Sequence, residues 1–281
     1  TIGCEVIGNG LYIYSDTVNF NINLIENDLM KVIGGTCNDM SELPTQCKHG
    51  YIVQVNNTKA QEDNYYLRFE GDGNQDGNGT WVECAKPKIQ NKFDQTNMPV
   101  TIVRTSATEF TVKRFNWKDR TIGDADVTNP DPSFVGKPIN RILFWRNRLA
   151  ILAGENVICS RPGDFGNFWI HTAVAVSTND PIDIACSSSF PSDLYDGIEL
   201  NDGLLVFSTD QQFLLSTTDS ITTPETTKLS SVSTYNYNKK VSPISLGKTV
   251  AFVDNSGKYS KFFEMANVAS VGQPDVVDQT K

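Results

Sequence analysis

Apolar and polar residues alternate with a period of two along much of the chain. β-Branched and aromatic residues gather in short runs that Asn, Asp and Gly interrupt, a pattern typical of strands joined by tight turns. In the first half these runs are Tyr51–Val55, Tyr65–Phe69, Thr101–Arg104 and Phe110–Phe115. The sequence therefore predicts a mainly β protein.

One segment has the spacing of a helix instead. Within Asn23–Ile33, apolar residues recur at every fourth position, and two glycines follow, as glycines do at helix ends. We expect a short helix here. A further helical turn is expected over Ser41–Pro44, where the proline would end it.

A weak internal repeat occupies the second half of the chain. Three segments share an apolar strand, a polar turn and a second strand: Arg148–Arg161, Gly203–Thr217 and Thr249–Glu264. Each follows a further apolar strand: Ile139–Trp145, Leu194–Leu200 and Val241–Leu246. Repeats of roughly 40–50 residues are typical of propeller blades, and a closed propeller needs at least about four blades. The pattern therefore predicts part of an irregular β-propeller, with an ordinary meander or sandwich as the alternative.

The segment Trp117–Pro138 contains few apolar residues and several turn formers. Connections this long tend to be functional or to join domains. We therefore expect a β-rich domain with one short helix over residues 1–116 and a connecting segment over 117–138. Propeller-like blades, about three hairpin repeats, would occupy residues 139–281.

Composition narrows the class of protein. Of 281 residues, 39% are apolar and 20% are charged, which excludes wholesale disorder, and no apolar run is long enough to span a bilayer. The formal net charge of −9 argues against a protein that grips nucleic-acid phosphates by general neutralisation. The first residues of the chain do not form a basic start followed by an apolar stretch, so no signal peptide is expected.

Six cysteines are too sparse for a disulfide scaffold, and none forms a C-x-x-C pair. They are Cys4, Cys37, Cys47, Cys84, Cys159 and Cys186. With only two histidines in the chain, a structural zinc site has few further ligands to draw on. Buried free thiols are the favoured interpretation.

The sharpest motif is Asp72–Glu83, which fits the calcium-loop pattern D-x-[DN]-x-[DN]-G-x5-E. Its matching residues are Asp72, Asn74, Asp76, Gly77 and Glu83. The flanking segments read as strands instead of helices, and Gly79 stands where an apolar residue normally ties such a loop to a partner. We therefore favour a hairpin tip rich in Gly, Asp and Asn, with calcium as the open alternative.

No motif of a hydrolase or a nucleotide-binding loop is present. Candidates for acid–base chemistry remain, and for each a role in turns, packing or the surface is favoured over catalysis. They are His49, His171 and the carboxylate pairs Asp124/Asp126 and Asp180/Asp183, beside Trp117 or Trp169. The sequence therefore predicts no catalytic, cofactor-binding or metal-binding residue.

Four arginines cluster around the first repeat: Arg141, Arg146, Arg148 and Arg161. On one continuous strand, Arg146 and Arg148 would point the same way, with Trp145 and Leu149 opposite. A nucleic-acid surface is one interpretation. Ion pairs with the many carboxylates, or contacts to a neighbouring subunit, are favoured because the chain is acidic.

Short motifs around the connecting segment resemble those of the tail nozzle proteins of short-tailed bacteriophages, also called tail tubular protein B. The resemblance spans about Leu43 to Phe213. It includes Met98-Pro99, Trp117-Lys118-Asp119-Arg120, Gly123-Asp124, Asn129-Pro130, Arg146-Asn147-Arg148-Leu149, Gly154-Glu155-Asn156, Ser160-Arg161 and Asp180-Pro181-Ile182-Asp183. The chain departs from the family pattern at Gly71–Gly79, where the hairpin tip is enlarged, and beyond Phe213, where only the strand pattern agrees.

The resemblance implies a structural virion protein without catalytic residues or cofactors. It implies a homohexameric ring in the phage tail, assembled in the host cytoplasm, that meets the tail adaptor protein and the tail fibres. Such a ring closes the distal DNA conduit, through which double-stranded DNA passes without specific binding. Members contain an irregular propeller and are much longer than this chain, so we expect further sequence outside it.

Two expectations follow for a ring of this kind. Ring closure needs a heterologous interface, so two different faces should be apolar or matched in charge. An acidic wall would also suit a DNA conduit, because basic side chains would hold the polyanion. The alternative function is a carbohydrate-binding or glycoside-hydrolysing β-propeller protein acting on the host envelope, which would place a carboxylate pair inside a pocket.

Overall fold

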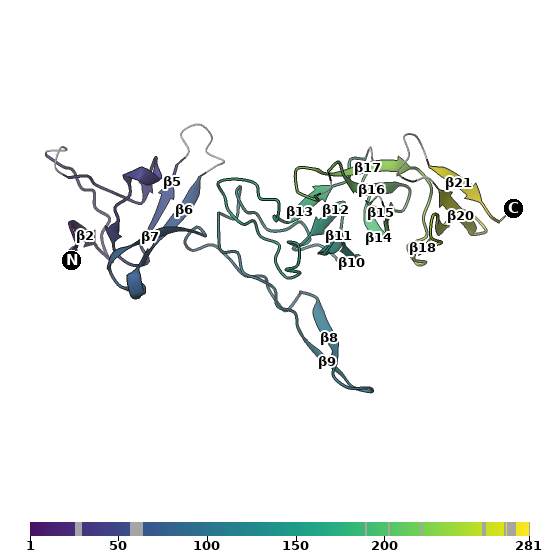
Figure 1. Cartoon of the computed structure of the whole chain (residues 1–281), viewed down its shortest axis with the longest axis horizontal. Coiled ribbons are helices and arrows are strands. Elements are labelled where there is room, and N and C mark those ends of the chain that lie inside the picture. Colours follow the sequence, from purple (N-terminus) through teal and green to yellow (C-terminus); the bar gives the residue numbers. More distant parts are fainter. Residues whose placement is uncertain are drawn as a thin grey trace. The chain divides into compact units, whose positions relative to one another are not determined.

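The computed structural model describes residues 1–25, 30–56, 64–188, 190–201, 203–219, 221–254, 257–266, 268 and 274–280. Over these residues nearly all of the regular secondary structure is β (Figure 1). The helical elements within them are the single-turn 3-10 helices η1 (Met40–Glu42) and η3 (Asp72–Asn74). The predicted mainly β class is confirmed.

The two helical predictions have different outcomes. The turn expected over Ser41–Pro44 is present as η1, which Asp39 caps by accepting a 2.7 Å hydrogen bond from the Ser41 backbone N–H. The helix expected over Asn23–Ile33 is not confirmed. Residues 23–25 and 30–33 are not helical, and residues 26–29 lie outside the described part of the chain.

The chain forms two compact units whose segments alternate along the sequence. The first comprises Thr1–Lys92, Asp119–Pro130 and Thr172–Ala175. The second comprises Phe93–Lys118, Asp131–His171 and Val176–Lys281. The domain boundaries expected at residues 116 and 138 remain a prediction.

The first unit contains a five-stranded sheet and a separate hairpin. In spatial order the sheet holds β3 (Thr36–Cys37), β5 (Ile52–Val55), β6 (Tyr65–Gly71), β7 (Gly77–Cys84) and β4 (Gln46–Cys47). The hairpin joins β1 (Gly3–Ile7) and β2 (Gly10–Tyr14). The alternating apolar residues Val53, Val55 and Leu67 form the core of the five-stranded sheet. The Trp81 indole N–H donates a 2.8 Å hydrogen bond to the Pro44 carbonyl.

The second unit contains three successive four-stranded sheets, each antiparallel and in sequence order. The first holds β10 (Arg141–Trp145), β11 (Arg148–Ala153), β12 (Asn156–Cys159) and β13 (Ile182–Ala185). The second holds β14 (Leu194–Leu200), β15 (Gly203–Ser208), β16 (Gln212–Thr217) and β17 (Thr227–Ser233). The third holds β18 (Ile244–Ser245), β19 (Val250–Asp254), β20 (Lys261–Ala266) and β21 (Asp275–Asp278). The three predicted hairpin repeats are confirmed, although the turn residues Asn255 and Ser256 lie outside the described part.

The second sheet is buried on both faces. Leu204 and Val206 of β15 pack into a core shared with the first sheet. The intervening residues Leu205 and Phe207 pack into another core with Phe252 of the third sheet. Side chains on a strand point alternately to opposite faces, which explains why β15 is an unbroken apolar run.

An aromatic cluster covers the other face of the first sheet. It packs against Ile151 and Ile158 and contains Phe93, Trp117, Phe134, Phe168 and Trp169. The rings of Phe93 and Trp169 stack with their centroids 4.8 Å apart. Trp117 and Phe134 come from the segment predicted to be a connection, so this segment also supplies part of a core.

A separate hairpin joins β8 (Val100–Arg104) to β9 (Phe110–Arg114) within the second unit (Figure 1). It forms a two-stranded sheet of its own. Its base is tied by Trp117, whose indole N–H donates a 3.3 Å hydrogen bond to the Pro99 carbonyl, directly before β8.

Candidate functional site

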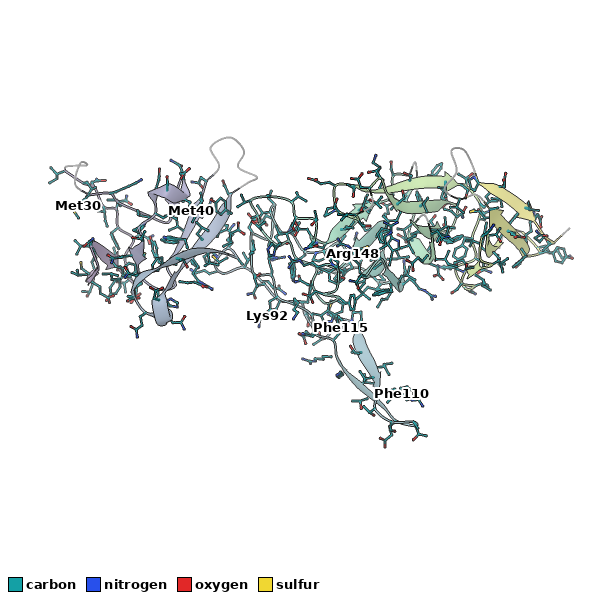
Figure 2. The ribbon with its side chains drawn as sticks, in the orientation of Figure 1. Met30, Met40, Lys92, Phe110, Phe115 and Arg148 are labelled. Atoms are coloured by element: carbon teal, nitrogen blue, oxygen red, sulfur yellow. The ribbon has the colours of Figure 1, made fainter. Side chains whose placement is uncertain are left out.

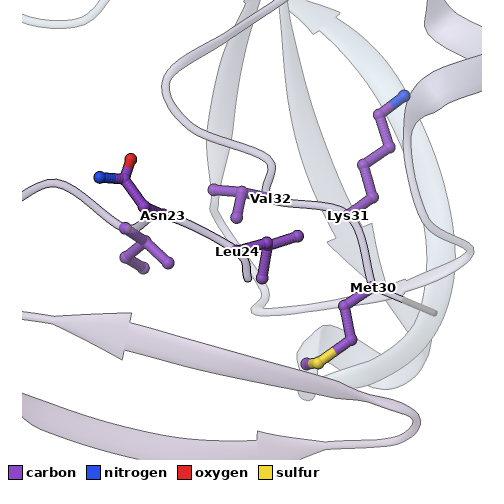
Figure 3. Close-up of a pocket in the computed structure, with 6 residues that line it drawn as sticks. Asn23, Leu24, Met30, Lys31 and Val32 are labelled. Atoms are coloured by element: carbon purple, nitrogen blue, oxygen red, sulfur yellow. The ribbon is translucent and has the colours of Figure 1, made fainter. Parts of the chain in front are cut away.

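A shallow, open hollow lies in the first unit beside the β1–β2 hairpin (Figure 3). Its walls are Ile22, Asn23, Leu24, Met30, Lys31 and Val32. Among the described residues, the lining combines apolar side chains with one amide and one amine and contains no carboxylate or imidazole.

The Asp124/Asp126 pair forms a turn. The Asp124 carboxylate accepts three backbone N–H groups, from Asp126, Val127 and Thr128, at 2.8–3.1 Å. Partial burial raises the pKa of Asp124, but these three hydrogen bonds outweigh it, and the pKa lies below its ordinary value. Such a carboxylate stays ionised and holds the backbone in place, as the turn interpretation predicts.

The second carboxylate pair, Asp180/Asp183, also accepts hydrogen bonds from N–H groups of the same chain. Asp180 accepts the backbone N–H groups of His171 and Ser177 at 2.7 and 2.8 Å. Asp183 accepts the backbone N–H of Ser133 at 2.8 Å and the side-chain amide of Asn156 at 2.9 Å. Asp180 therefore organises its own loop, whereas Asp183, on β13, ties the loop at Ser133 to the first sheet.

The calcium-like motif is split between a single helical turn and a strand. Asp76 binds Lys48 Nζ at 2.9 Å and accepts the His49 backbone N–H at 2.8 Å, so its pKa is lowered mainly by the lysine. Glu83 lies on β7 and accepts a 2.8 Å hydrogen bond from the Thr172 hydroxyl. Among the described residues, no group of three His, Cys, Asp or Glu side chains is placed to hold a metal ion. β6 and β7 pair across this segment, so it forms a hairpin tip, and the absence of a calcium site stays a prediction.

Arg146 and Arg148 do not lie on one strand, which corrects the sequence prediction. β10 ends at Trp145 and β11 begins at Arg148, and the two residues between form the hairpin turn. Arg146 and Asn147 have φ values of 44° and 59°, the left-handed pair that a type I′ turn requires. The sequence prediction took Arg146 and Arg148 as part of one continuous strand because the turn between β10 and β11 contains no glycine to mark it.

Arg148 is buried at the junction of the first two sheets (Figure 2). Its guanidinium donates hydrogen bonds to four backbone carbonyls: Ser160 at 2.8 Å, Asp180 at 2.7 Å, Thr178 at 3.3 Å and Thr222 at 3.2 Å. Burial lowers the pKa of Arg148, and the negative Asp180 opposes this effect. The side chain therefore joins Ser160, directly after β12, to two loops that belong to different sheets.

The other three arginines also have partners within the chain. Arg141 forms a 3.0 Å ion pair with Asp196, which is buried, so this prediction of an ion pair is confirmed. Arg146 donates a 3.0 Å hydrogen bond to the Thr222 hydroxyl. Arg161 donates one of 3.4 Å to the Asn179 carbonyl. The cluster holds the sheets together.

Comparison with known families now identifies the class of protein. Residues 2–281 match the family model described as bacteriophage nozzle protein. The chain belongs to this family. Among curated proteins, this nozzle-family chain is similar to the tail tubular protein gp12 of Escherichia phage T7, at 30% identity over 235 residues. That match covers 82% of the chain and 29% of the relative, so the chain spans less than a third of the relative's length.

Family membership makes this nozzle-family chain a structural protein of a phage tail. The resemblance stated from the sequence is confirmed. No helix in the described residues is long and apolar enough to cross a membrane.

All six cysteines of this chain are free thiols, and the prediction that they are buried holds for four of them. Cys37, Cys84, Cys159 and Cys186 are buried, whereas Cys47 is half-buried and Cys4 is exposed. Burial raises the pKa of Cys159 to about 12 and that of Cys186 to about 11. A thiol with so high a pKa remains protonated and packs as a small apolar group.

The structure adds residues that sequence reasoning missed. Thr222 joins Arg146 and Arg148 through its hydroxyl and its carbonyl, and Asp196 joins Arg141 to Tyr237. Nothing in the local sequence marks a carbonyl as an arginine partner. A lone Asp within an apolar strand such as β14 is a usable signal, because a buried carboxylate needs a cation or hydrogen-bond donors.

Proposed function

We propose that the chain is a subunit of a ring-shaped tail nozzle in a short-tailed phage. Six copies would surround the distal DNA conduit, form its gate and contribute to the region where tail fibres attach. The match to the nozzle family over nearly the whole chain carries this proposal. The similarity to the tail tubular protein of phage T7 supports it.

The three successive four-stranded sheets would be consecutive blades of an irregular propeller over residues 139–281. Their order agrees with this, since each sheet is a meander stacked face to face on the next. The β-rich part over residues 1–116 and the connecting segment over 117–138 would complete the architecture. The proposed partners are the tail adaptor protein and the tail fibres.

The electrostatics of the chain suit a conduit. The net charge is −9, and the arginines around the first sheet bind carbonyls, a hydroxyl or a carboxylate of their own chain. An acidic chain would weakly repel a passing polyanion, so DNA would slide without specific binding. In this role the chain acts without catalysis.

Electron cryomicroscopy of the complete protein tests the proposal. We expect rings of six copies around an axial channel, located in virion tails at the end distal to the capsid. Filter binding should show no tight retention of duplex DNA at about 0.1 M salt. A monomer that hydrolyses or tightly binds host-envelope carbohydrate would contradict the proposal and favour the alternative function.

A further inference from the structure

The β8–β9 hairpin carries an apolar face that its own chain leaves open. The register pairs Ile102 with Val112, so these side chains lie together on one face. Val100 and Phe110 extend the same face along the two strands. The four residues are 54%, 66%, 65% and 63% exposed in the order Val100, Ile102, Phe110 and Val112.

The hairpin is held rigid at both ends. At the tip, the Thr105 N–H donates to the Glu109 carbonyl at 3.0 Å, and Arg104 donates to the Ala107 carbonyl at 2.7 Å. At the base, Phe115 packs edge-on against Trp117, with ring centroids 5.0 Å apart. Figure 2 shows Phe115 at the base and Phe110 farther along the hairpin. The open face is therefore presented by an ordered element.

An isolated two-stranded hairpin is marginally stable in water and exposes unpaired backbone groups along both outer edges. β8 and β9 pair with each other and with no further strand in the described part of the chain. A partner that covers the apolar face would stabilise the hairpin, and one that adds a strand to an edge would pair its open backbone groups.

The charge of the same face selects the partner. Arg114 lies opposite Val100 and Arg104 lies opposite Phe110, so two arginines flank the apolar centre. Residues 100–114 carry a net charge of +2, which leaves −11 for the rest of the chain. A surface with an apolar centre and a basic rim fits an apolar patch with an acidic rim, and the rest of this chain is acidic in total.

We propose that the face formed by Val100, Ile102, Phe110 and Val112 docks onto a second copy of this chain. The contact is heterologous, because a basic hairpin meets an acidic surface elsewhere on the neighbour, and a ring can close through contacts of this kind. This docking would be one of the contacts between neighbouring subunits of the proposed ring. It rests on the proposed function only in requiring that copies of the chain associate.

Two adjacent substitutions on β9 test this docking in the complete protein. Val112→Asp places a charge on the apolar face, whereas Thr111→Asp places the same charge on the opposite face of the same strand. Both positions are exposed, so circular dichroism and thermal melting should show unchanged folding. By mass photometry, Val112→Asp should weaken self-association roughly tenfold or more, and Thr111→Asp should leave it near wild type.

The outcomes separate the docking from the ring. If the wild type and both variants assemble equally, the hairpin proposal is overturned while the ring proposal stands. If the wild type never self-associates, both proposals fail.

A photo-crosslinking residue in place of Phe110, used in assembled tails, identifies what covers the hairpin. Chain-to-chain products of twice the monomer mass, with an acceptor peptide from this same chain, are expected. Products only with another tail protein, with lipid or with DNA would overturn the assignment of the partner and leave the ring untouched.

Discussion

Arg148 and Asp180 are linked through the backbone: the guanidinium donates a 2.7 Å hydrogen bond to the carbonyl oxygen of Asp180. The carboxylate of the same aspartate accepts two backbone N–H groups of its own loop. Asp180 therefore organises the loop with its side chain and offers its carbonyl to the arginine. The positive charge of Arg148 is satisfied mainly by carbonyl dipoles.

Replacing Arg148 by methionine should destabilise the second unit by about 3 kcal/mol, because buried carbonyls lose their donor. Urea unfolding monitored by tryptophan fluorescence measures this free energy. Arg161→Met is the matched control, since Arg161 makes one 3.4 Å hydrogen bond at a less buried position, and its cost should stay below about 1 kcal/mol. Equal costs for the two variants would refute the role given to the four carbonyls.

Gly166→Ala should destabilise the protein by about 1–3 kcal/mol. A Cβ at this position would collide with the carbonyl oxygen of Asn116, next to the aromatic cluster. Gly34→Ala is the control, because nothing lies within 4 Å of a Cβ there. Differential scanning calorimetry should show a lower unfolding temperature for Gly166→Ala alone; an unchanged temperature would mean that the segment moves aside freely.

Asp124 should contribute to acid sensitivity. Its pKa lies below the ordinary value in the folded state, so its stabilising effect is present above about pH 4, the unfolded value, and is lost as the pH falls through the folded value. Unfolding free energies measured from pH 6 to pH 2.5 should fall less steeply for Asp124→Asn than for the wild type. An acid transition as steep in Asp124→Asn as in the wild type would contradict this role of the Asp124 carboxylate.

The thiols should react with a disulfide reagent at pH 8 in the order of their exposure. Cys4 is exposed and should react fastest, whereas the four buried cysteines should react only after unfolding. Cys4→Ser should remove the fastest phase and leave the slow one. Rapid labelling of Cys159 in the folded protein would contradict its burial and its raised pKa.

Periodicity alone located the hairpins of the second unit. In the first two repeats the paired apolar strands are buried on both faces, as β15 shows, and in the third β20 alternates, so the signal is strong and local. The fourth strand of each sheet gave no comparable signal. β17, with the sequence TKLSSVS, is mostly polar and lies at a sheet edge, where pairing is decided by its neighbour β16.

Long-range polar contacts were beyond prediction. Thr222 lies 74 residues from Arg148, and the atom it supplies is a carbonyl that every residue possesses. The turn at Arg146 and Asn147 was hidden because an arginine in a left-handed conformation has no sequence signature. The short sequence motifs identified the family, which the spacing of apolar residues could not do, because many unrelated β proteins share that spacing.

The two-faced burial of β15 limits how this protein can be shortened. A fragment that ends inside the second sheet would lay bare Leu205 and Phe207 or Leu204 and Val206, according to which neighbour is lost. A shorter fragment should therefore end outside the three four-stranded sheets, because truncation within them would expose apolar surface and cause aggregation.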